Sequence, residues 1–174
     1  MIVGLAGKMG AGKDFVADVL VKEYGFHRVA FADQIKAVLE EIDPLVEGHD
    51  VPLTYLTEWY GGWDEVKKYQ GVRTLLQRTG VAMRRLDPDV WVKAAFEHVD
   101  PLDRVVVTDV RFENEVRIIQ GLRGTVYRVT GRGGSTTSTG SHVSETALDN
   151  LKLPEIDNSG TIDNIRQWAE KRFA

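Results

Sequence analysis

Short apolar runs alternate with amphipathic segments along most of the chain. Continuous apolar runs predict buried strands, and apolar residues that recur every three or four positions predict helices. The predicted strands are residues 1–7, 26–32, 104–110, 125–131 and 155–160. The predicted helices are residues 14–24, 33–42, 72–86, 88–99, 113–122, 144–151 and 162–173. This alternation predicts an α/β protein, in which a parallel sheet carries helices on both faces.

Two stretches depart from this alternation. Residues 43–71 contain prolines, glycines and tryptophans without a clear period, and we interpret them as an irregular, partly helical insertion. Residues 132–141 have the sequence RGGSTTSTGS, which predicts a loop. Asp33 stands where the N-cap of a helix is expected. The length of 174 residues suits one domain, so we predict a single domain over residues 1–174.

The composition narrows the class of protein. Hydrophobic residues make up 43% of the chain and charged residues 28%, as in ordinary globular proteins. The absence of cysteine excludes disulfides and cysteine-ligated metals. No apolar run approaches the ~20 residues of a membrane span and no basic leader is visible, so we expect a cytoplasmic protein without a membrane partner. The formal net charge of -4 disfavours a nucleic acid polymer and favours a small anionic ligand.

A glycine-rich stretch, GKMGAGKD, joins the first predicted strand to the first predicted helix. Its glycines allow the backbone to bend so that several N–H groups point inward, and the following helix adds its positive N-terminal end. Lys13 then lies where an ammonium group reaches the β- and γ-phosphates of a nucleotide. A plain tight turn is the alternative, but the position between strand and helix favours a phosphate-binding loop. Its predicted contacts are Gly7, Gly10, Ala11, Gly12 and Lys13.

Two carboxylates are candidate metal ligands. Asp14 occupies the last position of the loop, where a hydroxyl residue that reaches magnesium is expected, and a carboxylate is also a suitable ligand for a hard cation. Asp109 ends another predicted strand, where P-loop proteins carry an acid near the metal. We therefore predict that Asp14 and Asp109 hold Mg²⁺. In the alternative interpretation, each carboxylate only caps a helix.

Arginines and one tryptophan gather in the middle of the chain, in RTLLQRTGVAMRRLDPDVW. Arg73 and Gln77 are four residues apart and share one face of a predicted helix. The arginine fork suits a phosphate, a glutamine amide can read the edge of a base, and Trp91 can stack on a base. In the opposite interpretation, the arginines form a solvated face and the tryptophan belongs to the core.

Further charged residues follow Asp109. Arg111 and Glu115 are four apart, so they either pair across one helical turn or leave Arg111 facing an anionic substrate. Arg132 begins the low-complexity loop directly after a predicted strand. A loop that closes over ATP and delivers an arginine to the transferring phosphate has this form, and a loop without such a role is the alternative.

Several stretches together resemble one family. They are GKMGAGKDFVADVL, FADQIKAVL, QRTG followed by DPDVWV, VVVTDVRFENE and HVSETALD. These stretches resemble the bacteriophage-type deoxynucleoside monophosphate kinases, whose loop also ends in Lys-Asp. That ending is similar to the animal-type phosphomevalonate kinases too, which belong to the same broad P-loop kinase group. The resemblance runs from residue 1 to about residue 150 and leaves residues 43–71 unmatched.

The resemblance implies a P-loop kinase fold with a five-stranded parallel sheet. It implies that the γ-phosphoryl group of ATP moves to the 5′-phosphate of a dNMP in the presence of Mg²⁺, and it is compatible with a homodimer. About residues 33–100 then bind the monophosphate, and residues 131–144 form a lid. Lys13, Arg111 and Arg132 are the implied catalytic residues, and Arg132 also contacts ATP. The predicted substrate-binding residues are Asp33, Lys36, Arg73, Gln77, Trp91, Arg111 and Glu115.

Other functions stay open at this stage. A kinase for another small phosphorylated metabolite, phosphomevalonate or dephospho-coenzyme A, would share the phosphate loop. A module that binds NTP without transferring phosphate is a second alternative, against which the arginine-rich centre argues. A GTPase-type switch is disfavoured, because Asp109 is followed by Val-Arg-Phe instead of x-x-Gly and the sequence has no Asn-Lys-x-Asp motif.

Overall fold

The computed structural model describes residues 1–100, 102–131 and 147–173. The chain divides into two compact units, Met1–Ala30 together with His98–Ala174, and Phe31–Glu97. Each unit has its own apolar core. Within the described ranges, no helix combines the length and the apolar character that a membrane crossing requires.

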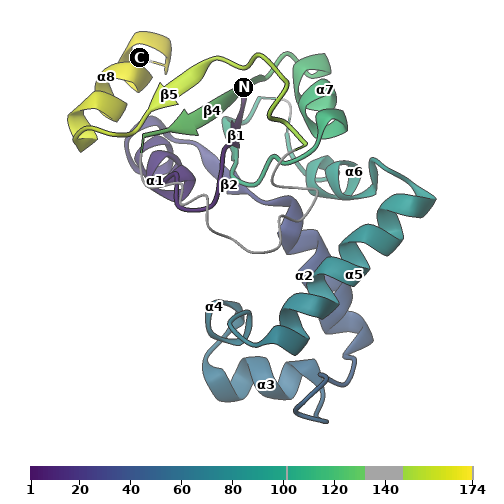
Figure 1. Ribbon diagram of the computed structural model, residues 1–174. Coiled ribbons are helices and arrows are strands. Elements are labelled where there is room, and N and C mark those ends of the chain that lie inside the picture. The colour runs from purple at the N-terminus through teal and green to yellow at the C-terminus, as the bar shows by residue number, and fades with distance from the viewer. Residues whose placement is uncertain (101, 132–146, 174) are drawn as a thin grey trace. The chain divides into compact units, whose positions relative to one another are not determined.

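Five parallel strands of the described chain form the sheet of the first unit, in the order β2-β3-β1-β4-β5 (Figure 1). The strands are β1 (Ile2–Ala6), β2 (His27–Val29), β3 (Val105–Val107), β4 (Thr125–Thr130) and β5 (Glu155–Asp157). β1 occupies the middle, where Gly4 pairs with Val107 on one side and with Val126 on the other. The predicted five-stranded parallel sheet is confirmed.

Helices cover both faces of this sheet. On one face, α1 (Lys13–Tyr24) and α8 (Ile162–Phe173) share an apolar core with the side chains of Val3 and Leu5. On the other face, α7 (Glu113–Gly121) packs so closely that a Cβ on Gly4 would lie 3.1 Å from its Ile119. Successive residues of a strand point to opposite faces, so β1 is buried on both, which explains its continuous apolar sequence.

The second unit is built from helices in the described structure. They are α2 (Phe31–Ile42), α3 (Leu53–Tyr60), α4 (Trp63–Val66), α5 (Gln70–Leu86) and α6 (Val90–Phe96). α2 packs against α3, α5 and α6. The core of this unit contains Leu39, Val46, Leu53, Leu56, Val66 and Val72. The insertion predicted over residues 43–71 is therefore more regular than expected, because it supplies two helices and part of a core.

Several helix boundaries differ from the predictions by one to three residues, and that of α2 concerns a predicted site residue. α2 begins at Phe31, two residues before Asp33, so Asp33 lies within the first turn and not at the N-cap. Its carboxylate accepts a hydrogen bond from Lys36 Nζ at 2.7 Å. A carboxylate in the first turn also interacts favourably with the positive end of the helix dipole.

Candidate nucleotide-binding site

The loop of residues 7–12 joins the carboxyl end of β1 to the first residue of α1. Gly7, Gly10 and Gly12 have φ angles of 139°, 81° and 85°, which L side chains rarely adopt. At Gly7 a Cβ would also lie 2.7 Å from the carbonyl oxygen of Val129. The glycines are therefore required by the backbone path, as the sequence pattern predicts for a phosphate loop.

Lys13 is folded back over this loop. Its Nζ donates hydrogen bonds to the carbonyl oxygens of Gly7, at 2.8 Å, and Lys8, at 3.0 Å. The ammonium group thus lies against the loop whose amides are the proposed phosphate donors. This arrangement agrees with the predicted placement of Lys13, while its contact with a phosphate stays a prediction.

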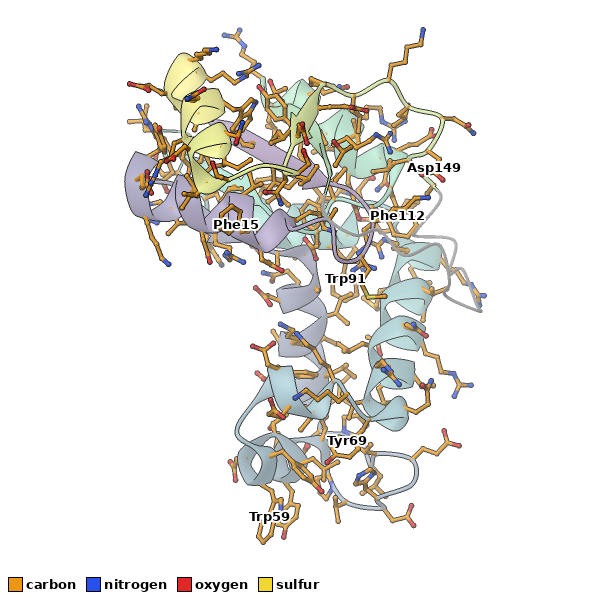
Figure 2. The ribbon with its side chains drawn as sticks, turned by 60° about the vertical axis from the view of Figure 1, so that its left-hand side comes forward. Phe15, Trp59, Tyr69, Trp91, Phe112 and Asp149 are labelled. Atoms are coloured by element: carbon orange, nitrogen blue, oxygen red, sulfur yellow. The ribbon has the colours of Figure 1, made fainter. Side chains whose placement is uncertain are left out.

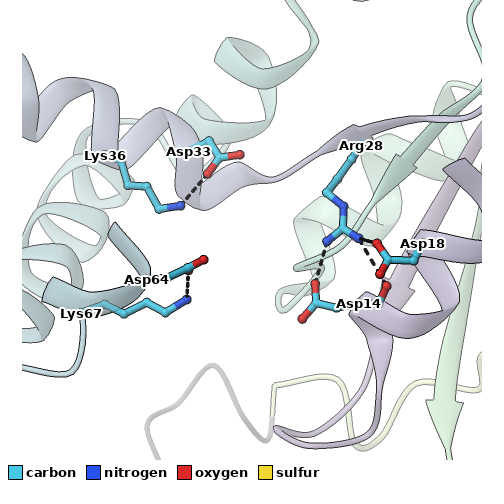
Figure 3. Close-up of polar contacts among 7 residues, drawn as sticks. All are labelled: Asp14, Asp18, Arg28, Asp33, Lys36, Asp64 and Lys67. Atoms are coloured by element: carbon cyan, nitrogen blue, oxygen red, sulfur yellow. Dashed lines mark hydrogen bonds and ion pairs between the residues drawn. The ribbon is translucent and has the colours of Figure 1, made fainter. Parts of the chain in front are cut away.

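Asp14 takes part in an ion-pair cluster that the sequence did not reveal (Figure 3). Arg28 of β2 donates from Nη1 to Asp14 Oδ1 at 2.8 Å and from Nη2 to Asp18 Oδ1 at 2.6 Å. The side chain of Asp14 is nevertheless 85% exposed, which leaves it accessible to a cation. The signal missed in the sequence is a lone arginine on an edge strand that lies beside the acidic first turns of α1.

Asp109 lies at the same edge of the sheet as the phosphate loop. β3 and β1 are adjacent parallel strands, and Asp109 follows β3 by two residues. Hydrogen bonds join this segment to β2 and β1. Thr108 N–H donates to the carbonyl oxygen of Val29 at 3.1 Å, and Val110 N–H donates to the carbonyl oxygen of Leu5 at 3.3 Å. Parallel strands bring their carboxyl ends to one edge, so this placement is what the pattern predicted for a second acid.

The carboxylates of Asp14 and Asp109 suit a hard cation, but two carboxylates do not complete the coordination of a metal ion. Among the described residues, no group of three or more histidine, aspartate or glutamate side chains is arranged to hold a metal ion. A magnesium ion at Asp14 and Asp109 would therefore take its remaining ligands from phosphate oxygens and water, as Mg²⁺ does at many nucleotide sites. The donor chemistry fits Mg²⁺ bound together with a nucleotide.

Glu115 has a different role from the one predicted. Its side chain is fully buried, and Oε2 accepts hydrogen bonds from the backbone N–H of Arg111 at 2.7 Å and of Phe112 at 3.0 Å. These donors precede the first turn of α7, so the carboxylate holds the chain where it enters the helix. The expectation that Glu115 binds substrate is corrected: it fixes the backbone that carries the exposed Arg111.

In the second unit, four predicted substrate contacts are accessible polar groups: Asp33, Lys36, Arg73 and Gln77. Lys36 of α2 pairs with Asp33 and lies 5.9 Å from the ring centre of Trp63. Arg73 and Gln77 are exposed on α5, four residues apart as predicted, and Arg73 Nη2 donates to Gln70 Oε1 at 3.0 Å. Their binding of a substrate stays a prediction.

Trp91 is a core residue in this structure. Its side chain is 2% exposed, and its Nε1–H donates to the carbonyl oxygen of Gly80 at 3.2 Å. Figure 2 shows its contrast with Trp59, which projects from α3 and is 71% exposed. The expectation that Trp91 stacks on a base is corrected, because its side chain is buried and its indole N–H already has a partner in Gly80.

The predicted lid lies almost wholly outside the described residues. Of residues 131–144, only Gly131 is described, and Arg132 is not. The proposed roles of Arg132 in catalysis and in binding ATP therefore stay predictions.

Comparison with known proteins places the chain near viral sequences. No known protein-family model matches it. It is 27% identical to a protein of Acanthamoeba polyphaga mimivirus named "Putative deoxynucleotide monophosphate kinase", over 95% of this chain and 92% of that protein. It is also 32% and 31% identical to the proteins ORF77 and ORF76 of Ictalurid herpesvirus 1 (strain Auburn), over 92% and 94% of this chain. The chain spans 64% and 63% of the length of these two relatives.

Among solved structures, the chain is similar to two small-molecule kinases. With dephospho-CoA kinase from Campylobacter jejuni it shares 15% identity and a TM-score of 0.46, over 98% of this chain and 94% of that one. With shikimate kinase from Bacteroides thetaiotaomicron the identity is 11% and the TM-score 0.45, over 98% and 97%. Since both scores are below 0.5, the fold rests on the strand order and register described above. By sequence, the chain is similar over nearly its full length to a viral protein named "Putative deoxynucleotide monophosphate kinase".

Proposed function

We propose that this protein is an ATP-dependent kinase that transfers the γ-phosphoryl group of ATP to a deoxynucleoside monophosphate. The observation that carries the proposal is the glycine loop of residues 7–12, which leads from β1 directly to Lys13 and α1. The choice of acceptor is supported by the mimivirus relative, to which the chain is similar over nearly the full length of both proteins.

The transfer itself asks for little covalent chemistry. An oxygen of the acceptor phosphate forms a bond to the γ-phosphorus while the bond to the β–γ bridging oxygen breaks, so the products are a dNDP and ADP. The attacking oxygen is already anionic, and no strong general base is needed. The protein therefore contributes alignment of the two phosphates and positive groups that offset the charge of the transferring phosphoryl.

Lys13 is the first of these positive groups. Its ammonium group now contacts two carbonyl oxygens of its own loop, those of Gly7 and Lys8. Anionic phosphate oxygens attract an ammonium group more strongly than neutral carbonyls do, so a bound triphosphate would draw Lys13 away from at least one of them. The same group then stabilises the charge that develops on the γ-phosphoryl.

The carboxylates at this edge would hold the metal. Asp14 and Asp109 are the residues that we propose for Mg²⁺, and the bound ion would offset the charge of the β- and γ-phosphates. Arg28 keeps one oxygen of Asp14 engaged, and so fixes the orientation of that carboxylate.

The candidate residues for the acceptor are Arg111 in the first unit and Lys36, Arg73 and Gln77 in the second. Arg111 follows Asp109 and is exposed, and Glu115 fixes the backbone at its position. Arg73 and Gln77 are the candidates of α5 for the phosphate and the base.

An acceptor panel tests the proposal. The purified protein, ATP and Mg²⁺ are incubated with each dNMP, each NMP, phosphomevalonate and dephospho-coenzyme A, and products are separated by ion-exchange chromatography. We expect a dNDP and ADP in equal amounts from at least one dNMP. A preference for phosphomevalonate or dephospho-coenzyme A would redirect the proposal to another metabolite kinase, and release of free phosphate alone would contradict phosphoryl transfer.

A pair of matched variants ties the activity to the loop. Lys13→Ala should lower turnover by roughly 10³-fold or more, because it removes a charge that acts on the transferring phosphoryl. Lys22→Ala removes the same charge from the exposed far end of the same helix and should keep the activity of the unaltered protein. Equal activity of the two variants would show that the turnover does not depend on this loop.

A further inference from the structure

A buried peptide carbonyl of the phosphate loop needs a partner within the protein, because water does not reach it. The carbonyls of Gly7 and Lys8 accept hydrogen bonds from Lys13, and the carbonyl of Gly12 accepts one from Val16 N–H at 3.2 Å. These partners are close in sequence. The carbonyl of Ala11, between the two last glycines, is bound by a residue from the other end of the chain.

That residue is Asn158, directly after β5. Its Nδ2 donates to the carbonyl oxygen of Ala11 at 3.0 Å, across 147 positions of sequence. A carbonyl oxygen can only accept, so the nitrogen end of the amide must be the one that faces it. Asn158 is 1% exposed and Ala11 is 4% exposed, so this contact lies inside the protein and not in a solvent-open site.

The backbone at Asn158 is itself held in place. Its backbone N–H donates to the carbonyl of Thr130 at the end of β4, at 2.8 Å. In the next turn, Asp157 Oδ1 accepts from Ser159 N–H at 2.9 Å, and hydrogen bonds from Ser159 lower the pKa of the Asp157 carboxyl. A Cβ on Gly131 would lie 2.4 Å from Ser159 N, which shows how closely β4 and this turn approach.

The direction of the Ala11 carbonyl determines the direction of one amide. In a trans peptide the C=O of one residue and the N–H of the next point in opposite directions, and the described chain has no cis peptide bond. Because Asn158 holds the Ala11 carbonyl toward the interior, the N–H of Gly12 must point the other way, out of the interior. Gly12 has a φ of 85°, in the left-handed region that glycine adopts without steric cost, so the backbone can take this orientation.

We propose that Asn158 is a positioning residue of the phosphate loop, which fixes the peptide between Ala11 and Gly12 so that the Gly12 N–H faces the bound phosphate. The inference rests on the proposed function for the identity of the anion, but the orientation of the peptide does not depend on it. Asn158 touches no phosphate itself and acts through the loop backbone.

Two variants and one control test this role. Asn158→Ala removes the donor. Asn158→Asp keeps the shape but loses the N–H, and its carboxyl donates to Ala11 again only when protonated. The control is Asn164→Ala, since Asn164 is an exposed asparagine at the start of α8 that bonds Thr161 and not the loop.

The first measurement is amide hydrogen exchange in the nucleotide-free protein. Asn158→Ala should raise the exchange of the Ala11 N–H, which donates to the carbonyl oxygen of Lys8 at 3.2 Å, by about tenfold, as expected for the loss of about one hydrogen bond, while the strands of the sheet keep their protection. Asn164→Ala should leave the loop as in the unaltered protein. Unchanged exchange in the loop of Asn158→Ala would overturn the inference, whether or not the protein binds ATP.

The second measurement is the dissociation constant of ATP by calorimetry between pH 8 and pH 5.5. Asn158→Asp should bind about tenfold more weakly than the unaltered protein at pH 8, and the ratio of the two constants should approach one as the pH falls. A ratio that stays constant with pH would overturn the role of the donated hydrogen bond. If the unaltered protein binds no ATP, the proposed function fails, and the exchange measurement alone decides the role of Asn158.

Discussion

Replacing Glu115 distinguishes a structural carboxylate from a substrate contact. Glu115 Oε2 accepts hydrogen bonds from the backbone N–H groups of Arg111, at 2.7 Å, and Phe112, at 3.0 Å, and both bonds are partly buried. Glu115→Ala leaves both donors without this acceptor, and Glu115→Gln keeps an oxygen but removes the charge. Both variants should therefore lose stability, the alanine variant more than the glutamine variant.

The magnitude follows from the two hydrogen bonds. A bond to a charged group contributes about 1.5–3 kcal/mol, so Glu115→Ala should lower the free energy of unfolding by about 3–6 kcal/mol. Hydrogen bonds to a neutral acceptor retain about half of that stabilisation, so Glu115→Gln should lower the free energy of unfolding by about 2 kcal/mol. A typical domain has a total of about 5–15 kcal/mol, which makes the alanine variant marginal and the glutamine variant usable for kinetics.

The assay is urea unfolding followed by far-ultraviolet circular dichroism, together with the KM of the acceptor for the glutamine variant. Glu113→Gln is the matched control, because Glu113 is an exposed carboxylate in the first turn of the same helix. We expect Glu115→Gln to be less stable than Glu113→Gln and to keep its acceptor KM within about twofold. Equal stability of the two variants, with a raised acceptor KM for Glu115→Gln alone, would refute the structural role and restore a contact with substrate.

Three further outcomes are expected. Trp91→Phe should lower the free energy of unfolding by about 1–3 kcal/mol, since it removes a buried indole N–H, and should leave the acceptor KM unchanged in steady-state kinetics. Asp14→Ala should raise the Mg²⁺ concentration needed for half-maximal turnover by about tenfold or more, and an unchanged magnesium titration would count against a metal role. Arg166 lowers the pKa of Glu23, so the stability that this pair adds is present above the ordinary pKa of glutamate and is lost as the pH falls through the lowered value. The melting temperatures of Arg166→Ala and the unaltered protein should therefore differ at pH 7 and converge as the pH falls below the lowered pKa of Glu23.

The parts of the fold that the sequence predicted are those with local causes. β1 is a continuous apolar run because both of its faces are covered, and the loop glycines have φ angles that other residues rarely adopt. Arg73 and Gln77 share a helix because their spacing fits one turn. Such features depend on residues within a few positions of each other in the sequence, so the sequence pattern predicts them.

The features that escaped prediction depend on burial or on distant partners. α3 and α4 were not predicted within residues 43–71, because both helices are short and the glycines between them interrupt the helical period of apolar residues. Spacing alone does not reveal that Trp91 faces the core, nor that Glu115 turns toward backbone amides.

Two polar residues near the phosphate loop have partners that only the folded chain brings within reach. Arg28 of β2 reaches Asp14 of α1, and Asn158, which follows the edge strand β5, reaches Ala11 in the loop after β1. Neither residue belongs to the glycine-rich stretch, so the loop motif does not predict either contact.

The most direct test of the account is a crystal structure of the protein with Mg²⁺ and a non-hydrolysable ATP analogue. The triphosphate should lie on the backbone amides of residues 10–14, the Gly12 N–H should donate to it, and Lys13 Nζ should leave the carbonyl of Gly7 or Lys8 for a phosphate oxygen. An analogue bound elsewhere, with Lys13 still on both carbonyls, would contradict the central claim that this loop holds the nucleotide.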